Sequence, residues 1–268
     1  VDTVQSDTSQ SVTKNADHHW ESSTTINQTG AITSGGGLAM QSGNDTTLKG
    51  ATVSAGGDMA VVAGGNLTAT TVTNTSTYNN VATDDRTRKQ SDRSYDEQAV
   101  GTNINACGNA TLAALGADPA KGNVTLTGSS LAAGSGAATI AATGNVTINE
   151  GREEHDSYSA TESKRGSFVH GSTTDTMQNT QANIGVGSTV SGDTVTVSAG
   201  RDLSVKGSTI AGTNDVNLAA AGKVNITTSQ DTQSTSSYYQ KHESGLGSDG
   251  GIGISVGSKT QTDTASTT

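Results

Sequence analysis

Two short clusters combine histidine with carboxylate residues, the side-chain chemistry that binds zinc. They are Asp17-His18-His19 and Glu153-Glu154-His155-Asp156. Neither cluster recurs at a regular spacing along the chain, and adjacent histidines in a strand point to opposite faces. We therefore interpret both as solvated polar segments and predict no metal site.

Three other strings match catalytic or ligand-binding patterns only formally. Ser11-Val12-Thr13-Lys14 fits Ser-x-x-Lys without its companion motifs. Gly245–Gly250 fits G-x-G-x-x-G, but it neither follows a buried strand nor opens a helix. The acidic turns at Asp58 and Asp202 are isolated, whereas the calcium-binding nonapeptide occurs in tandem, so we expect both aspartates to shape turns. The sequence thus predicts no catalytic residue and no cofactor.

The composition indicates an unusual core. Leu, Ile, Val and Phe together supply only 41 of the 268 residues, and the aromatic content is 3%. The chain carries a net charge of −10, which argues against nucleic acid as a partner because phosphates attract clustered Lys and Arg. The single cysteine, Cys107, excludes an internal disulfide framework, and we expect it to be a small buried thiol. No apolar run approaches the length of a transmembrane helix.

An internal repeat is the strongest signal in the chain. Gly50, Gly128 and Gly207 stand in similar phrases and recur at a period of about 78–79 residues. Three further sets of glycines keep this spacing: Gly30, Gly108 and Gly187; Gly43, Gly122 and Gly200; and Gly65, Gly144 and Gly222. Four landmarks in phase indicate a solenoid built from repeated units.

A finer period lies inside each repeat, as from Gly122 to Gly144. Each of these glycines opens an alternating phrase such as Gly144-Asn145-Val146-Thr147-Ile148, which is typical of a short half-buried strand. Short strands recurring at roughly 20 residues predict an all-β, right-handed parallel β-helix. If the whole chain coiled in this way, about 13 turns would form a rod on the order of 60 Å long.

We interpret the chain, residues 1–268, as one β-helical segment of about 3.4 repeats, each holding one polar excursion. The core coils are predicted at roughly 26–73, 104–149 and 184–227, and the polar excursions at roughly 1–25, 74–103, 150–183 and 228–268. The excursions are either hairpins that leave the rod or wider, more polar turns of the same helix. The glycine-rich stretch from Gly245 to Gly257 favours a hairpin, and Asp118-Pro119 favours a loop because proline removes a ladder donor.

Several phrases resemble the haemagglutinin repeats of filamentous haemagglutinin-like exoproteins. They are S-A-G-x-D-L-x-V-x-G-S-x-I at 198–210, A-G-G-N-L at 63–67, and the polar stretch ending in G-I-G-I-S-V-G-S-K at 251–259. These exoproteins include long adhesins and contact-dependent growth inhibition (CdiA-type) toxins of Gram-negative bacteria, secreted by two-partner systems. The core with its polar excursion is similar to their second, C-terminal repeat region.

This resemblance implies a secreted or cell-surface filament segment rather than an enzyme. Its function would be toxin delivery into the target-cell envelope or adhesion, with an outer-membrane transporter of the two-partner system and a target membrane or surface receptor, protein or glycan, as partners. A passive stalk and a β-helical polysaccharide-active enzyme are the alternatives. The core phrases carry almost none of the converging carboxylates that such an enzyme needs.

The aromatic residues of the excursions are the candidate contact residues, because Tyr and Trp are enriched where proteins meet partners or membrane interfaces. The full candidate set is His18, His19, Trp20, Tyr78, Tyr95, Tyr158, Phe168, Tyr238 and Tyr239.

Overall fold

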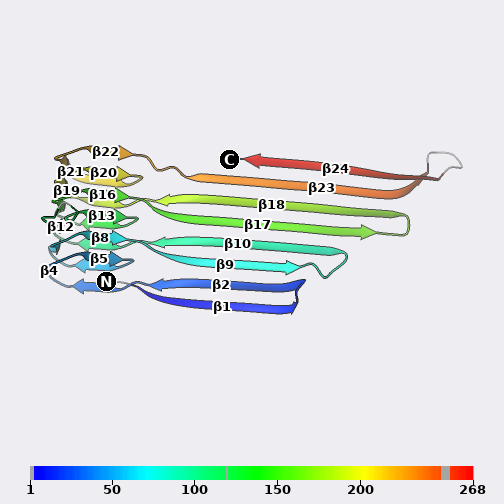
Figure 1. Ribbon diagram of the computed structural model, residues 1–268, viewed down its shortest axis with the longest axis horizontal. Coiled ribbons are helices and arrows are strands. Elements are labelled where there is room, and N and C mark those ends of the chain that lie inside the picture. The colour runs from blue at the N-terminus through cyan, green and yellow to red at the C-terminus, as the bar shows by residue number, and fades with distance from the viewer. Residues whose placement is uncertain (1–2, 119, 249–253, 268) are drawn as a thin grey trace.

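The computed structural model describes residues 3–118, 120–248 and 254–267, and the chain there is all β (Figure 1). Two parts are joined side by side. One is a compact solenoid of short parallel strands, and the other is a sheet of long antiparallel hairpins that extends away from the solenoid. No described segment forms a helix that could cross a membrane.

The solenoid consists of six coils in the described chain, each turning through up to three short strands. The first two coils contain β3 (Ala31–Ser34), β4 (Leu38–Ser42) and β5 (Thr46–Lys49), then β6 (Thr52–Ala55), β7 (Met59–Ala63) and β8 (Leu67–Thr70). The next two contain β11 (Asn103–Ala106), β12 (Ala110–Ala114) and β13 (Val124–Thr127), then β14 (Ser130–Ala133), β15 (Ala137–Ala142) and β16 (Val146–Asn149). The last two contain β19 (Thr189–Ala199) and β20 (Leu203–Lys206), then β21 (Thr209–Ala220) and β22 (Val224–Thr227).

Parallel pairing stacks each coil on the next. Ile32 pairs with Val53 of the following coil, and Val190 pairs in the same way with Ile210. The inward positions therefore form ladders of Leu, Ile, Val and Ala, and every residue of the buried core cluster lies in the solenoid. The core is thin because each coil contributes only a few aliphatic side chains, which matches the low Leu, Ile, Val and Phe content of the sequence.

Two polar ladders run along the corners of the solenoid. The hydroxyl ladder consists of Thr102, Ser129, Ser188 and Ser208, and each of these oxygens accepts a hydrogen bond from the backbone of the preceding coil. At another corner, Asp45, Asn66, Asn123, Asn145 and Asp202 each present a side-chain oxygen to the backbone N–H of the next coil. These bonds satisfy backbone groups that the turns leave out of the sheet ladders. Asp58 and Asp202 thus shape turns, as predicted, by bonding to the next coil.

Four hairpins leave the solenoid, with two coils between each hairpin and the next. They are β1 (Val4–Asn15) with β2 (His18–Gln28), β9 (Val72–Ala82) with β10 (Arg88–Val100), β17 (Gly151–Gly166) with β18 (His170–Val186), and β23 (Thr232–Ser248) with β24 (Ile254–Thr267). Neighbouring hairpins also pair with each other, through β2 with β9, β10 with β17, and β18 with β23. The result is one eight-stranded antiparallel sheet, which we call the hairpin sheet.

The ratio of one hairpin to two coils has a geometric reason. Two coils rise by about 9.6 Å at the usual interstrand spacing of roughly 4.8 Å, and a hairpin contributes two strands at the same spacing. Successive hairpins therefore meet edge to edge without gap or overlap. This match explains why the sequence repeats once for every two coils and one hairpin, and not at every coil.

The predicted fold class is confirmed: an all-β parallel β-helix with polar hairpins. The excursions are hairpins, not wider turns, so the solenoid has six coils in the described chain and a height of about 29 Å instead of about 60 Å. The described residues of the stretch from Gly245 to Gly257 belong to the last hairpin, and residues 249–253 lie outside the described residues. Residues 115–123 connect β12 to β13, and Pro119 within them lies outside the described residues.

The prediction of a buried Cys107 is wrong. Cys107 stands in the turn between β11 and β12, directly after the last inward position of β11, and its side chain is exposed. The alternation that buries Ala106 turns the next residue outward, because successive side chains of a strand point to opposite faces.

Candidate contact surface

Strand register divides the candidate contact residues between the two faces of the hairpin sheet. Residues paired across an antiparallel ladder lie on the same face, as do alternate residues of one strand. Tyr95 pairs with Asp156, which shares its face with Tyr158, and Tyr158 pairs with Asn179. Asn179 shares its face with Met177, which pairs with Tyr238. Tyr95, Tyr158 and Tyr238 therefore share one face, which we call the tyrosine face.

The other candidate residues are distributed over the opposite face and the hairpin ends. Trp20 pairs with Asn80, so Trp20 and Tyr78 lie on the face opposite the tyrosine face, and the same register places Tyr239 there. His18 pairs with Ala82 and shares this second face, whereas His19 pairs with Val81 on the tyrosine face. Phe168 lies at the turn between β17 and β18, where it is 99% exposed. Only part of the predicted set is therefore brought together.

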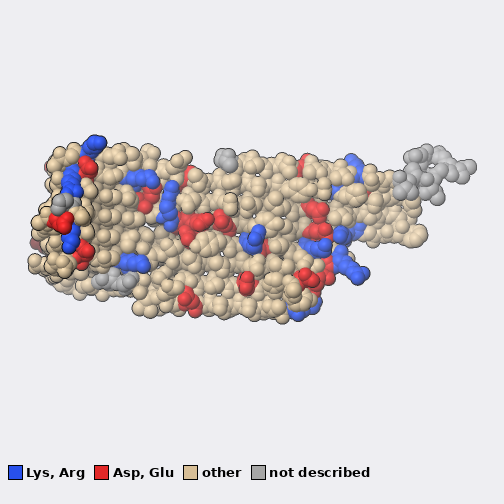
Figure 2. Space-filling model, in the orientation of Figure 1, with Lys and Arg blue, Asp and Glu red and all other residues tan. Residues whose placement is uncertain are grey.

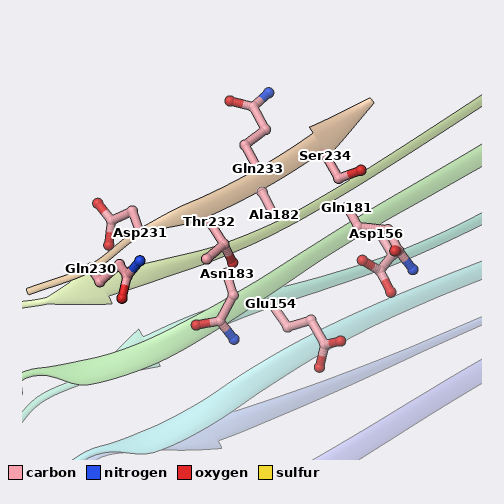
Figure 3. Close-up of a pocket in the computed structure, with 10 residues that line it drawn as sticks. All are labelled: Glu154, Asp156, Gln181, Ala182, Asn183, Gln230, Asp231, Thr232, Gln233 and Ser234. Carbon is pink, nitrogen blue, oxygen red and sulfur yellow. The ribbon is translucent and has the colours of Figure 1, made fainter. Parts of the chain in front are cut away.

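The tyrosine face is hollowed near the solenoid. A cavity of about 520 Å³ lies over β17, β18 and the start of β23 (Figure 3). In this cavity the carboxylates of β17 stand beside the carboxamides of β18 with which they pair, and hydroxyls and further amides line the rim. The residues that supply these groups include Glu154, Asp156, Gln181, Asn183, Thr232 and Ser234.

Two further hollows continue this cavity toward the far end of the hairpins. The first has a volume of about 290 Å³, shares Asp156 and Gln181 with the larger cavity, and is walled by Tyr95 and Tyr158. The second has a volume of about 330 Å³ and includes Met177 and Tyr238 among its lining residues. We call the three together the groove: it is rich in carboxylates and amides near the solenoid and aromatic in its middle part. At its far end Lys89, Glu162 and Asp175 line it beside Tyr238.

Neighbouring side chains hold the two tyrosines of the groove wall in place. The Tyr95 hydroxyl donates a hydrogen bond of 2.6 Å to Glu97 Oε1. This bond, together with burial and the charges of Glu97, Glu154 and Asp156, raises the pKa of Tyr95 to about 12. The Arg93 guanidinium lies over the Tyr158 ring, 4.7 Å from its centre, in a cation–π contact. The aromatic wall is therefore ordered before any partner arrives.

The charges of the hairpin sheet are unevenly distributed. Figure 2 shows acidic side chains gathered near the solenoid, and a mixture of acidic and basic side chains toward the far ends of the hairpins. No ion pair joins Glu154 or Asp156 to another described side chain, whereas Glu162 near the hairpin end contacts both Lys89 and Lys164. The groove near the solenoid thus carries uncompensated negative charge.

The two histidine clusters form ion pairs between neighbouring hairpins. His155 Nδ1 lies 2.6 Å from Asp96 and its Nε2 lies 3.6 Å from Glu153, and the hydrogen bond to Asp96 is the main cause of the raised pKa of His155. His18 and Lys14 both contact Asp84, which lowers the pKa of that carboxyl from 3.8 to about 2. Across the described residues, no three His, Cys, Asp or Glu side chains converge in a metal-binding arrangement.

One charged site at the base of the third hairpin was not anticipated from the sequence. Glu150 has a side chain only 3% exposed, and it lies 3.1 Å from Lys206 Nζ and 3.9 Å from Arg152 Nε. Arg152 in turn contacts Asp231 at the start of the fourth hairpin. Glu150 lies over Gly207, just as Thr71 lies over Gly128. The sequence signal for this site is that the charged Glu150 stands at the position that Thr71 occupies in another repeat.

Comparison with known proteins identifies relatives of this repeat. The family model described as "Hemagglutinin repeat" matches residues 2–84, 83–241 and 169–268. The chain is 36% identical over 224 residues to the "tRNA nuclease CdiA-2" of Burkholderia pseudomallei (strain 1026b), covering 83% of the chain and 7% of that protein.

More distant relatives match a shorter part of the chain. It is 36% identical over 123 residues to the "16S rRNA endonuclease CdiA" of Enterobacter cloacae, which covers 46% of the chain and 4% of that protein. The chain therefore spans only a small fraction of the relatives that it matches. No solved structure matches it.

Proposed function

Because this chain belongs to the haemagglutinin-repeat family, we propose that it is a repeat segment of a two-partner-secreted exoprotein at the surface of a Gram-negative bacterium. Its function is to engage the envelope of a target cell during contact-dependent toxin delivery. The solenoid is the rigid support, and the hairpin sheet is the surface that makes contact.

The continuity of the hairpin sheet is the observation that carries this proposal. Four separate excursions would each present a few mobile side chains, whereas β2–β9, β10–β17 and β18–β23 pairing fixes eight strands in one surface. Both faces carry half-exposed aromatic side chains among hydroxyls and amides. A passive stalk would need only the coils, because the coils already bury the hydrophobic core.

Delivery is favoured over adhesion by the relatives. The matched proteins carry the name CdiA in four genera, and the CdiA-2 of Burkholderia pseudomallei aligns with 83% of this chain. The nuclease activities in their names belong to those much longer proteins. For this chain we propose no enzymatic role, because its match to the family model is to a haemagglutinin repeat and its alignment covers 7% of the Burkholderia pseudomallei protein.

The partners follow from the same interpretation. The parent protein would cross its own outer membrane through the transporter of the two-partner system. The hairpin sheet would then meet the outer membrane or a surface receptor, protein or glycan, on the target cell. Nucleic acid is left out of the proposal because of the net charge of −10.

Binding to isolated envelopes tests the proposal. The exposed Cys107 lies in the solenoid, in the turn between β11 and β12, and provides one site for a fluorescent label. We expect the labelled chain to bind intact Gram-negative cells and outer-membrane vesicles saturably, and protease to leave fragments that contain the hairpins. Binding without protection would show adhesion instead, and absence of binding to any envelope would refute the contact role.

A variant with scrambled hairpin residues and intact coils serves as the control. The scramble keeps Ser, Thr, Asn and Gln composition and strand length, so the hairpins retain their capacity to pair, while the positions of Tyr, Trp and charged side chains change. If the scrambled chain binds as well as the original, the hairpin sheet is a passive element and the proposal is wrong.

A further inference from the structure

The groove on the tyrosine face has a chemistry that is distinct from the rest of the hairpin sheet. Near the solenoid, side chains that both donate and accept hydrogen bonds, Gln181 and Asn183, face the acceptors Glu154 and Asp156. Farther out, Tyr95 and Tyr158 replace them as an aromatic wall. Planar polar groups beside an aromatic surface match a ligand that has hydroxyls on its edges and C–H groups on its faces.

We propose that this groove binds an uncharged oligosaccharide of the target-cell surface. The inference deepens the contact function proposed above and rests on it, since the groove is part of the contact surface. Sugar hydroxyls would bond to the carboxylates and amides of the larger cavity, and the face of a pyranose ring would pack on the wall formed by Tyr95 and Tyr158.

Charge argues against an anionic ligand. Glu154 and Asp156 have no ion-pair partner among the described side chains, and Glu97 accepts hydrogen bonds from Tyr95 and from the backbone N–H of Glu154. A phosphate or carboxylate in the larger cavity would face this negative charge, since Arg93, the cation that lines the next hollow, lies over the Tyr158 ring. Like charges brought together in a partly desolvated site are unfavourable.

Strand pairing argues against an extended peptide or a lipid surface. A peptide adds to a sheet through an open edge, whereas β17 and β18 are interior strands that are paired on both sides, with β23 between β18 and the edge strand β24. A lipid surface requires a continuous apolar face, and the cavity near the solenoid is lined mostly by carboxylates, amides and hydroxyls. A ligand on this face of the sheet therefore contacts side chains and not backbone N–H and C=O groups.

The groove is ordered in the free chain, which lowers the entropy lost on binding. Glu97 fixes the Tyr95 hydroxyl, and Arg93 lies over one side of the Tyr158 ring. β17 and β18 pair without interruption from Gly151 and Val186 to Gly166 and Gly171, so their side chains keep a fixed spacing. A ligand would meet a formed surface.

Titration of the full chain with defined tetrasaccharides tests the inference, with NMR chemical shifts as the readout for weak binding. The neutral probes are maltotetraose, cellotetraose and N-acetylchitotetraose, and the charged probes are a heparin tetrasaccharide and a glucosamine tetramer. Tyr158→Ala and Gln181→Ala remove groove side chains. Tyr78→Ala and Gln178→Ala are the matched controls, because both residues lie on the opposite face.

We expect at least one neutral probe to bind and both groove variants to weaken it by about fivefold or more, as for other residues at the centre of an interface. The controls should stay within about twofold. Binding of charged probes alone, equal loss in the control variants, or no binding of any neutral probe would overturn the inference.

The envelope assay separates failure of this inference from failure of the proposed function. If the chain binds outer membranes with protected hairpins but binds none of the neutral probes, the sugar inference fails and the contact function stands. If a neutral probe binds in a groove-dependent way but no envelope is bound, the groove is a sugar site and the delivery function fails.

Discussion

Replacing Ser188 with alanine tests whether the hydroxyl ladder stabilises the solenoid. Ser188 is 1% exposed. Its hydroxyl donates a 2.6 Å hydrogen bond to the Asn149 carbonyl oxygen and accepts a 3.1 Å bond from the Ser129 backbone N–H. Alanine fits the same space, so the change removes two hydrogen bonds without creating a steric conflict.

The expected loss follows from the one buried group that the change leaves without a partner, the Ser129 backbone N–H, because the Asn149 carbonyl oxygen still accepts a hydrogen bond from the Gly128 N–H. An unsatisfied buried donor costs about 1–3 kcal/mol, so Ser188→Ala should lower the free energy of unfolding by roughly 1–3 kcal/mol. With a urea m-value of about 3 kcal/mol/M, the unfolding midpoint should fall by about 0.3–1 M. Hydrogen exchange should accelerate first in β14 and β19, because each coil is supported by its neighbours.

Two variants control this measurement. Ser198→Ala changes an exposed serine of β19, the strand that begins directly after Ser188, and should alter stability by no more than about 0.5 kcal/mol. Ser188→Thr should retain most of the stability, since Thr102 occupies the equivalent place two coils earlier. If Ser188→Ala proves no more destabilising than Ser198→Ala, the hydroxyl ladder contributes little and the reasoning fails.

Three further predictions concern the turn glycines, the inter-hairpin ion pairs and the charge at the hairpin base. Gly128→Ala should lower the melting temperature, because φ is +52° and an added Cβ would lie 2.6 Å from Thr71 Cγ2, whereas Gly36→Ala, with nothing within 4 Å, should have little effect. The Asp96 contact raises the pKa of His155 above 6.5, so the stability that this contact contributes should be complete below pH 6.5 and lost as the pH rises through the raised value. The Asp84 carboxyl, with its pKa near 2, should lose its contribution to stability only as the pH falls below 3.8 toward 2. NMR titration of both groups would contradict this reasoning if neither pKa moved. Lys206→Met should lower the free energy of unfolding in urea by about 1–2 kcal/mol, because the buried Glu150 carboxylate keeps only Arg152, at 3.9 Å, as an ion-pair partner. Lys49→Met is the control, since Lys49 precedes Gly50, beside which Thr3 stands in place of a carboxylate. An equal loss of stability in both variants would refute a role for the ion pair.

The sequence alone determined the features that depend on local chemistry. Alternation of small aliphatic and polar residues between glycines specifies short strands. The long repeat marked by four sets of glycines specifies that equivalent coils stack on one another. The left-handed φ of Gly50, Gly128 and Gly207 explains why those landmarks are glycine. The residue after several of the repeated glycines is Ser or Thr, a signal from which the hydroxyl ladder could have been predicted.

Only the tertiary structure decided how the polar excursions are used. Strand alternation fixes which residues of one strand share a face, but the register between strands far apart in sequence decides which strands' residues meet. Tyr95, Tyr158 and Tyr238 come together because β10 pairs with β17 and β18 pairs with β23, contacts between different repeats. The groove and the buried Glu150 arise in the same way, since each needs side chains from hairpins or coils that neighbour one another only after the solenoid has stacked.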